Sequence, residues 1–153
     1  MTASTLVSNL IGEGKIYKVL PTIYNSIKMG YFILVLPCLL AAIFPEYVIR
    51  VFTSDESLVR DGCVSLLVMF SSYIITVPSQ IIFRAVSGTG DTRKAFHIEI
   101  ISLLAYMLYI CIVILYLNVS LPLCWCAEYI YQGVVLICSM VYFKYGTWRN
   151  RRI

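Results

Sequence analysis

Charged side chains are scarce in this sequence, and their scarcity excludes an ordinary water-soluble domain. Asp, Glu, Lys and Arg make up 13% of the 153 residues, against about 25% in a typical soluble domain. Apolar residues make up 60%, and the mean hydropathy is +0.85. Such a chain has too few polar groups to cover its own surface, so its surface must be met by lipid. The sequence predicts an all-α, polytopic membrane helix bundle.

The usual patterns of enzymes and metal sites are also missing. There is a single histidine, and no nucleophile lies in a recognisable arrangement with a base. The six cysteines lack the spacing of zinc sites, and inside apolar spans they act as small hydrophobic residues. Cys124-Trp125-Cys126 comes closest to a motif, but packing in the membrane explains it better. We therefore expect no enzyme, no catalytic residue, no metal and no bound cofactor.

The net charge of +4 does not indicate nucleic acid, because the basic residues lie at the ends of apolar segments. About 20 helical residues cross a hydrocarbon core about 30 Å thick. The turn-forming sequence Asn118–Pro122 divides the longest apolar stretch in two. Residues 29–143 are therefore predicted to form a four-helix transmembrane region. The predicted spans are 29–49, 62–84, 98–117 and 122–143.

The flanking residues predict the topology. Residues 1–28 are interpreted as the end of a preceding helix, terminated at Gly12–Gly14, followed by an amphipathic segment on the cytoplasmic membrane face. Residues 144–153 form a basic tail. Lysines before the first span, the basic residues of the Gly88–Lys94 connection and those of the tail place both termini and this connection in the cytoplasm. We expect an integral protein of a bacterial inner (plasma) membrane.

Glu128 is the informative ionisable residue, because it lies six or seven residues inside the fourth predicted span. A charge there costs on the order of 1–3 kcal/mol unless it faces water, is paired or is protonated. Two interpretations stay open: the side chain reaches outward to the interface, or it binds a proton or cation in a central cavity. Tyr129, Tyr131 and Gln132 are near enough in sequence to share a polar face with it.

The second span carries a proline with polar neighbours at membrane depth, Pro78-Ser79-Gln80. Proline removes a backbone hydrogen bond, so Pro78 and, in the first span, Pro37 predict kinks. Tyr73 lies deep in the second span. It could line an aromatic cavity for lipophilic cations, although packing against lipid explains it as well.

Three connections contain helix-boundary signals. The glycines of Gly88-Thr89-Gly90-Asp91-Thr92 permit a sharp turn, and Asp91 or Thr92 can cap the following helix. This segment lacks the third glycine and the lysine of phosphate-binding loops. Glu99, close to the predicted start of the third span, is expected to act as a cap near a helix N-terminus. Thr53–Glu56 has the form of a capping box, which predicts a helix start at Thr53.

Three segments in order resemble the multidrug and toxic compound extrusion (MATE) transporters. Ser8–Lys15 is similar to the family's "(G/S)-x-x-(L/I)-G-x-G-(K/D)" connection. Ser79–Arg93 is similar to its "R-G-x-G-D-T" turn with the proline-bearing helix before it. Pro45 and Val51–Asp55 resemble the outer loop between those two features. All three occur in the family's order and spacing.

The resemblance implies a twelve-helix fold of two lobes, of which this chain is similar to the last four helices and the end of the eighth. It implies a fragment, a split-gene product or a degenerate member, partnered by a missing N-terminal lobe or another membrane chain. It also implies export of small organic cations or amphipathic compounds, driven by entry of Na+ or H+.

The resemblance also directs attention to particular side chains. The family's tenth helix often carries an acidic coupling residue, but the matching second span has neither Asp nor Glu. Coupling would then rest on Glu128 or on the absent half, with Pro78 and Gln80 as cavity candidates. Two other functions stay open: a small accessory membrane protein that transports nothing, and part of a flippase for lipid-linked saccharides.

Overall fold

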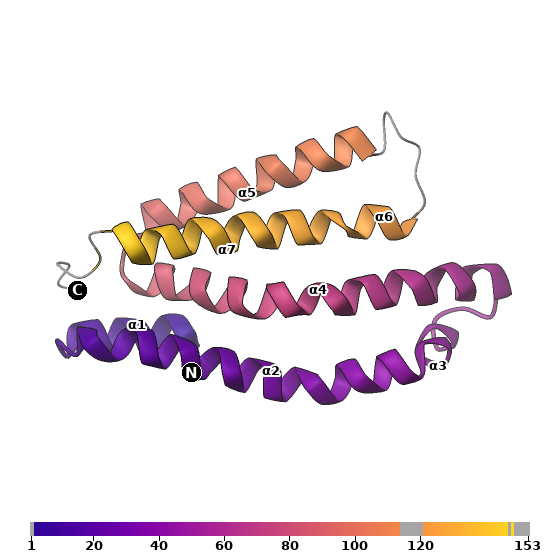
Figure 1. Cartoon of the computed structure of the whole chain (residues 1–153), viewed down its shortest axis with the longest axis horizontal. Coiled ribbons are helices and arrows are strands. Elements are labelled where there is room, and N and C mark those ends of the chain that lie inside the picture. Colours follow the sequence, from indigo (N-terminus) through magenta and orange to yellow (C-terminus); the bar gives the residue numbers. More distant parts are fainter. Residues whose placement is uncertain (1, 114–120, 147, 149–153) are drawn as a thin grey trace.

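The structure is a computed structural model that describes residues 2–113, 121–146 and 148 (Figure 1). The predicted end of the third span, the turn after it and most of the basic tail therefore lie outside the described residues. Within the described part the chain is helical and contains no strand. The helices are α1 (Ala3–Gly12), α2 (Val19–Ile43), α3 (Pro45–Arg50), α4 (Glu56–Gly88), α5 (Thr92–Ile112), α6 (Leu121–Trp125) and α7 (Ala127–Tyr145), with a short 3-10 turn, η1 (Ile16–Lys18), before α2.

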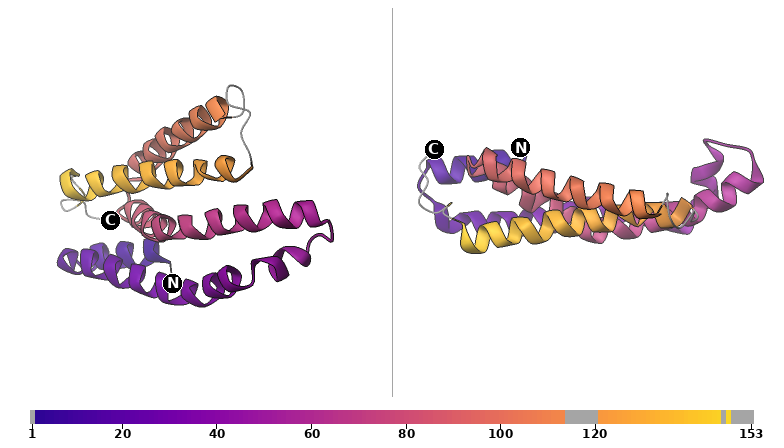
Figure 2. Two further views of the ribbon diagram at one scale, coloured as in Figure 1. Left: turned by 45° about the vertical axis from the view of Figure 1, so that its right-hand side comes forward. Right: turned by 90° about the horizontal axis from the view of Figure 1, so that it is seen from above.

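Four helical segments of the described chain are long and apolar enough to cross a membrane, which confirms the predicted fold class. They are Ile16–Ile43, Glu56–Gly88, Thr92–Ile112 and Leu123–Tyr145. Helix α4 lies between α2 and α7, and α5 packs against α7 (Figures 1 and 2). The short α1 packs against both α2 and α4. The longest helix is therefore the one around which the others assemble.

Small side chains allow α4 to pack closely against its neighbours. Ser65, Ser72 and Ser79 recur every seventh residue and are all buried, as is typical of helix contacts within membranes. The partners on α7 advance along the chain as those on α4 do, because Ser79 is hydrogen-bonded to Gln132 and Thr89, the C-cap of α4, to Tyr142. Helices α4 and α7 therefore run parallel, as two spans separated by one return crossing must.

The apolar core lies toward the end of the bundle where α1 meets α2 and α4. Thirteen buried residues form it, among them Val7, Val19, Val86, Val135 and Trp148. Two turns at this end have a glycine in the left-handed region, Gly14 at φ 72° and Gly90 at φ 77°. Both follow the end of a helix, where glycine adopts this conformation without a steric penalty.

The first predicted span, 29–49, is not a single helix. Helix α2 ends at Ile43, the backbone leaves the helical region at Phe44, and Pro45 begins α3. Proline lacks an N–H group and suits the first position of a helix, which explains the new start. The predicted amphipathic segment becomes the 3-10 turn and the first part of α2, with no helix boundary at Lys28. Helix α2 contains Pro37 and curves along its length (Figure 1).

Helix α4 begins at Glu56, so its first turns precede the predicted span 62–84. The predicted Thr53 cap is wrong: Asp55 is the N-cap, and its carboxylate accepts a hydrogen bond from the backbone N–H of Ser57 at 2.9 Å. Thr53 instead accepts a hydrogen bond from the backbone N–H of Asp55 at 3.3 Å. The loop is therefore held by two successive short-range contacts that lead into the helix.

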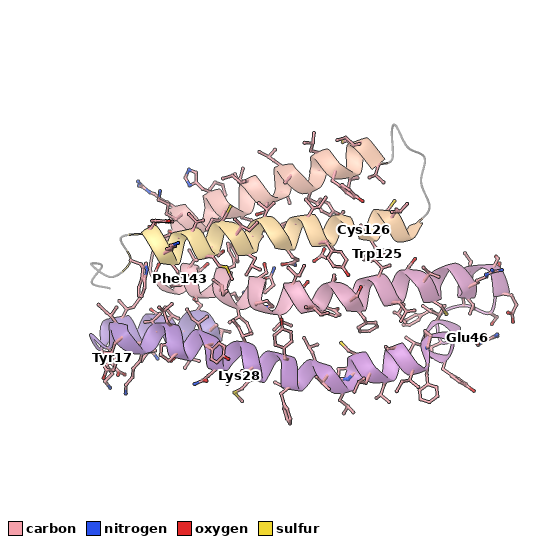
Figure 3. The ribbon with its side chains drawn as sticks, viewed as in Figure 1. Tyr17, Lys28, Glu46, Trp125, Cys126 and Phe143 are labelled. Atoms are coloured by element: carbon pink, nitrogen blue, oxygen red, sulfur yellow. The ribbon has the colours of Figure 1, made fainter. Side chains whose placement is uncertain are left out.

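The fourth predicted span, 122–143, is interrupted. Helix α6 ends at Trp125, and α7 begins at Ala127 after a turn at Cys126 (Figure 3). Glu128 therefore lies in the first turn of α7 and not six or seven residues inside a continuous helix. A carboxylate is favoured at that position by the partial positive charge of a helix N-terminus.

Candidate functional site

A chain of side-chain hydrogen bonds connects α7 to α4. The Glu128 carboxylate accepts a hydrogen bond from Nε2 of Gln132 at 2.7 Å. Oε1 of Gln132 accepts one from Nε2 of Gln80 at 3.2 Å. We call Glu128, Gln132 and Gln80 the amide relay. It brings together two of the residues singled out in the sequence, Glu128 and Gln80, through a third that lies between them.

Gln132 is the centre of the relay and its most buried member, with 3% of its surface exposed. It follows Glu128 by one helical turn, so the two side chains lie on the same face of α7. A buried amide must be hydrogen-bonded to offset its desolvation, and both ends of the Gln132 side-chain amide are. In addition, the hydroxyl of Ser79 donates to the backbone carbonyl of Gln132 at 3.0 Å.

A second carboxylate, that of Glu99 on α5, is hydrogen-bonded to Tyr131, the residue before Gln132 on α7. The hydroxyl of Tyr131 donates to Oε1 of Glu99 at 2.6 Å. The expectation that Glu99 caps α5 is wrong, because α5 begins at Thr92 and Glu99 lies two turns inside it. The N-cap is Asp91, one of the two caps predicted, and its carboxylate accepts from the backbone N–H of Lys94 at 3.4 Å.

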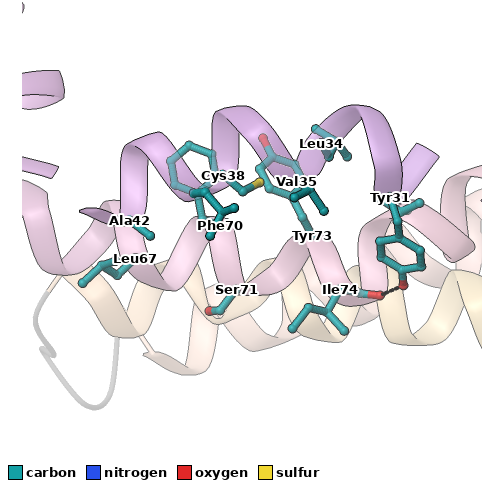
Figure 4. Close-up of a pocket in the computed structure, with 12 residues that line it drawn as sticks. Tyr31, Leu34, Val35, Cys38, Ala42, Leu67, Phe70, Ser71, Tyr73 and Ile74 are labelled. Carbon is teal, nitrogen blue, oxygen red and sulfur yellow. Dashed lines mark hydrogen bonds between the residues drawn. The ribbon is translucent and has the colours of Figure 1, made fainter. Parts of the chain in front are cut away.

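Pro78 and Tyr73 lie outside the relay. Pro78 precedes Ser79 within α4, where it leaves the carbonyl of Ile74 without its helical donor. The hydroxyl of Tyr31 on α2 donates to that carbonyl instead (Figure 4). Tyr73 lines a groove of about 450 Å³ between α2 and α4, together with Tyr31 and Phe70. This α2–α4 groove is a separate, mostly apolar feature, and the structure does not bring Tyr73 to Glu128.

The predicted cytoplasmic turn is a packing junction. A Cβ atom on Gly88 would come within 2.5 Å of the backbone carbonyl oxygen of Ser4, so only glycine allows α1 to lie this close to α4. Thr89 is fully buried, and its hydroxyl is 2.7 Å from that of Tyr142 on α7. With Gly90, Asp91 and Thr92 it connects α4 to α5.

Several polar residues of the bundle were not singled out as site residues from the sequence. Gln132 was noted only as a neighbour of Glu128, although the pair has the i, i+4 spacing that places both on one helical face. Ser79 was noted only as a polar neighbour of Pro78 and Thr89 only as part of the Gly88–Thr92 turn, because serine and threonine are common in membrane helices. Among the described residues no group of three or more His, Cys, Asp or Glu side chains could hold a metal ion.

Comparison with known proteins identifies the family. The family model MatE matches residues 1–112. No curated protein and no solved structure matches the chain. The MatE match covers well over half of the 153 residues, and it includes α1 to α5, with the Gly88–Thr92 turn and the proline-bearing helix before it. The chain is therefore an integral membrane protein of the MatE family, a family of membrane transporters.

Proposed function

We propose that this chain forms part of a secondary-active exporter of organic cations or amphipathic compounds, driven by inward movement of H+ or Na+. The observation that carries the proposal is the amide relay, which connects a membrane carboxylate, Glu128, to the proline-bearing helix α4. Polar and ionisable groups inside a membrane bundle are costly and usually mark ion or substrate pathways. The other lobe of the transporter is supplied by further residues or by another chain.

The relay gives ion binding a structural consequence. Ionised Glu128 is a hydrogen-bond acceptor only, and it orients the amide of Gln132 with Nε2 toward itself. When a proton binds, the carboxyl group becomes a donor, which favours a rotated Gln132 amide with Oε1 toward Glu128. The Nε2 group of Gln132 then faces Gln80, whose amide must rotate in turn. Binding of a proton to Glu128 on α7 thereby changes the orientation of the Gln80 side chain on α4. A bound Na+ acts on the same contact, because it attracts the oxygen of Gln132 and repels Nε2.

Gln80 lies two residues after Pro78, where α4 lacks one backbone hydrogen bond. A helix bends most readily at such a position. Transport by alternating access requires that ion binding favour one conformation of the bundle over another. Rotation of the Gln80 amide beside Pro78 makes one conformation of α4 more favourable than the other when the ion is bound.

The α2–α4 groove supports the proposed substrate class. Its volume of about 450 Å³ falls within the range of about 300–1,000 Å³ typical of small-molecule sites. Its walls carry the aromatic rings of Tyr31, Phe70 and Tyr73, and aromatic faces attract organic cations. A flat, lipophilic cation matches both the apolar walls and the rings.

The direct test is gradient-driven dye efflux. Everted membrane vesicles that contain the full chain, in the membrane where it is naturally expressed, are given an external ethidium-type cation under an H+ or Na+ gradient directed out of the lumen. Efflux from the cell is then measured as uptake into the vesicles. We expect Glu128→Gln to abolish the gradient dependence. Glu46→Gln, which changes an exposed carboxylate in α3, serves as the control and should leave it intact. Undiminished gradient-driven efflux by Glu128→Gln would refute the coupling role, and movement of lipid-linked saccharide without dye efflux would indicate a flippase.

A further inference from the structure

A second groove lies where the beginning of α5 meets the end of α7, at the end of the bundle that the charge pattern places in the cytoplasm. Its volume is about 420 Å³, and we call it the α5–α7 groove. Polar side chains lie where α5 begins and α7 ends, and apolar ones continue along both helices toward the middle of the bundle. The polar group includes Lys94, His97 and Tyr145, and the apolar group includes Ile101, Ile137 and Val141.

The polar end of the groove carries one exposed cation among its lining residues, Lys94. Lys94 and His97 are both exposed and lie one turn apart on the same face of α5. Nδ1 of His97 is hydrogen-bonded to the backbone carbonyl of Arg93. The groove also includes one acid, Asp91, but it is only 6% exposed and caps α5 through the backbone N–H of Lys94. A ligand at this end therefore meets the Lys94 ammonium group before the Asp91 carboxylate.

The apolar end of the groove is open. Ile101, Ile137 and Val141 are 52%, 63% and 51% exposed, which leaves a continuous hydrocarbon surface beside Lys94. A small soluble anion would gain nothing from that surface. A zwitterionic lipid would cover it but would bring no net negative charge to Lys94. The two halves of the groove fit one molecule that carries both an anionic group and a hydrocarbon chain.

We propose that the α5–α7 groove binds one anionic phospholipid of the cytoplasmic leaflet. The phosphate group lies at Lys94, and one acyl chain lies along Ile101, Ile137 and Val141. Tyr145, 73% exposed at the same end, lies at headgroup depth, where tyrosine is enriched. The α2–α4 groove has no Lys, Arg or His among its lining residues, and it provides a comparison site within the same chain.

The test is photo-crosslinking of the full chain in phosphatidylcholine vesicles. Phosphatidylglycerol with a diazirine in one acyl chain is compared with a phosphatidylcholine probe that carries the same group. We expect the anionic probe to label peptides that contain Ile101, Ile137 or Val141 several times more strongly than the zwitterionic probe. The change Lys94→Gln should reduce that labelling by roughly three- to tenfold, since one cation near an anionic surface contributes on the order of a fivefold change in binding.

Lys18→Gln is the matched control, because Lys18 is an exposed lysine at the same end of the bundle that does not line the α5–α7 groove. It should leave labelling unchanged, and circular dichroism should show equal helicity in all variants. Equal labelling by both probes, equal losses in the two lysine variants, or labelling concentrated on the α2–α4 groove would overturn the proposal. So would displacement of the probe by millimolar glycerol 3-phosphate, which would show that Lys94 binds a soluble phosphate compound.

Discussion

The hydroxyl of Tyr31 donates its hydrogen bond to the backbone carbonyl of Ile74, which is the carbonyl that Pro78 leaves without its helical donor. An unpaired carbonyl inside a membrane is costly, and a side chain from a neighbouring helix is one way to satisfy it. The contact ties α2 to α4 beside the proline (Figure 4). The proline of one helix and a tyrosine of another are therefore parts of the same structural feature.

Tyr31→Phe should destabilise the chain by about 1 kcal/mol, which is the usual net contribution of one hydrogen bond. The measurement is thermal or denaturant unfolding of the purified chain in detergent. Tyr73→Phe is the matched control. Tyr73 lines the same groove, and its hydroxyl makes no hydrogen bond within the described residues, so this change should have little effect. The effect of Tyr31→Phe should also shrink in a Pro78→Ala background, where the introduced alanine restores a backbone donor. Equal losses in both backgrounds would contradict this account.

Gly88→Ala should loosen the contact between α1 and α4. The added methyl would lie 2.5 Å from a backbone oxygen and 3.0 Å from the Cα of Ser4, and backbone atoms cannot move aside as a flexible side chain can. Overpacking of this kind costs about 1–3 kcal/mol. Gly133→Ala is the control, because a Cβ there meets no atom within 4 Å, and in a helix it should leave stability unchanged or raise it by up to about 1 kcal/mol. Similar losses for both variants would argue against the close approach of α1.

Ser139 and Ser79 should respond oppositely to alanine. Both are fully buried, but within the described residues the hydroxyl of Ser139 has no hydrogen-bond partner, whereas that of Ser79 donates to Gln132. Removing a buried, unsatisfied hydroxyl relieves a desolvation cost. Ser139→Ala should therefore unfold at the same or a higher temperature than the unaltered chain. Ser79→Ala should lose about 0.6–1 kcal/mol. A larger loss of stability for Ser139→Ala than for Ser79→Ala would show that the Ser139 hydroxyl has a hydrogen-bond partner.

The start of α4 should weaken in acid. The hydroxyl and the backbone N–H of Ser57 both donate to the Asp55 carboxylate, and these hydrogen bonds hold its pKa below the ordinary value. A lowered pKa in the folded chain stabilises the helix start above the ordinary aspartate pKa of about 3.9. That stabilisation is lost as the pH falls through the lowered value. Hydrogen exchange in the first turn of α4, corrected for its intrinsic pH dependence, should show this loss of protection. Asp55→Asn, which keeps a capping side chain, should abolish the pH dependence.

The bundle was predictable because its signals are local. Apolar length identified four spans, and the glycines near residue 90 identified the turn between α4 and α5. The helix ends were less predictable, because Cys126 carries no strong breaking signal, and because Pro45, which marks the break after Phe44, lies inside the stretch that was predicted as one span. Those ends matter for function, since the break at Cys126 moves Glu128 to the first turn of α7.

The amide relay was predictable only in part. Glu128 and Gln80 stood out as polar residues among apolar ones, but their connection depends on α4 and α7 running parallel in one register. That register is a property of packed helices and cannot be read from either segment alone. The same holds for Tyr31, because its hydrogen bond to the carbonyl of Ile74 depends on how α2 packs against α4. Tyr73 was grouped with the cavity candidates from depth alone, and it faces a different groove.

The measurement that tests the central claim most directly is the sidedness of the two ends of α4. Single cysteines replace Ser54, before the helix, and Thr92, after it, in a chain whose native cysteines are changed to alanine or serine; both positions are exposed. Intact cells are treated with a membrane-impermeant maleimide. We predict labelling of Ser54→Cys from outside, and of Thr92→Cys only after the membrane is permeabilised. Labelling of both positions from the same side would contradict a membrane crossing by α4 and the arrangement built around it.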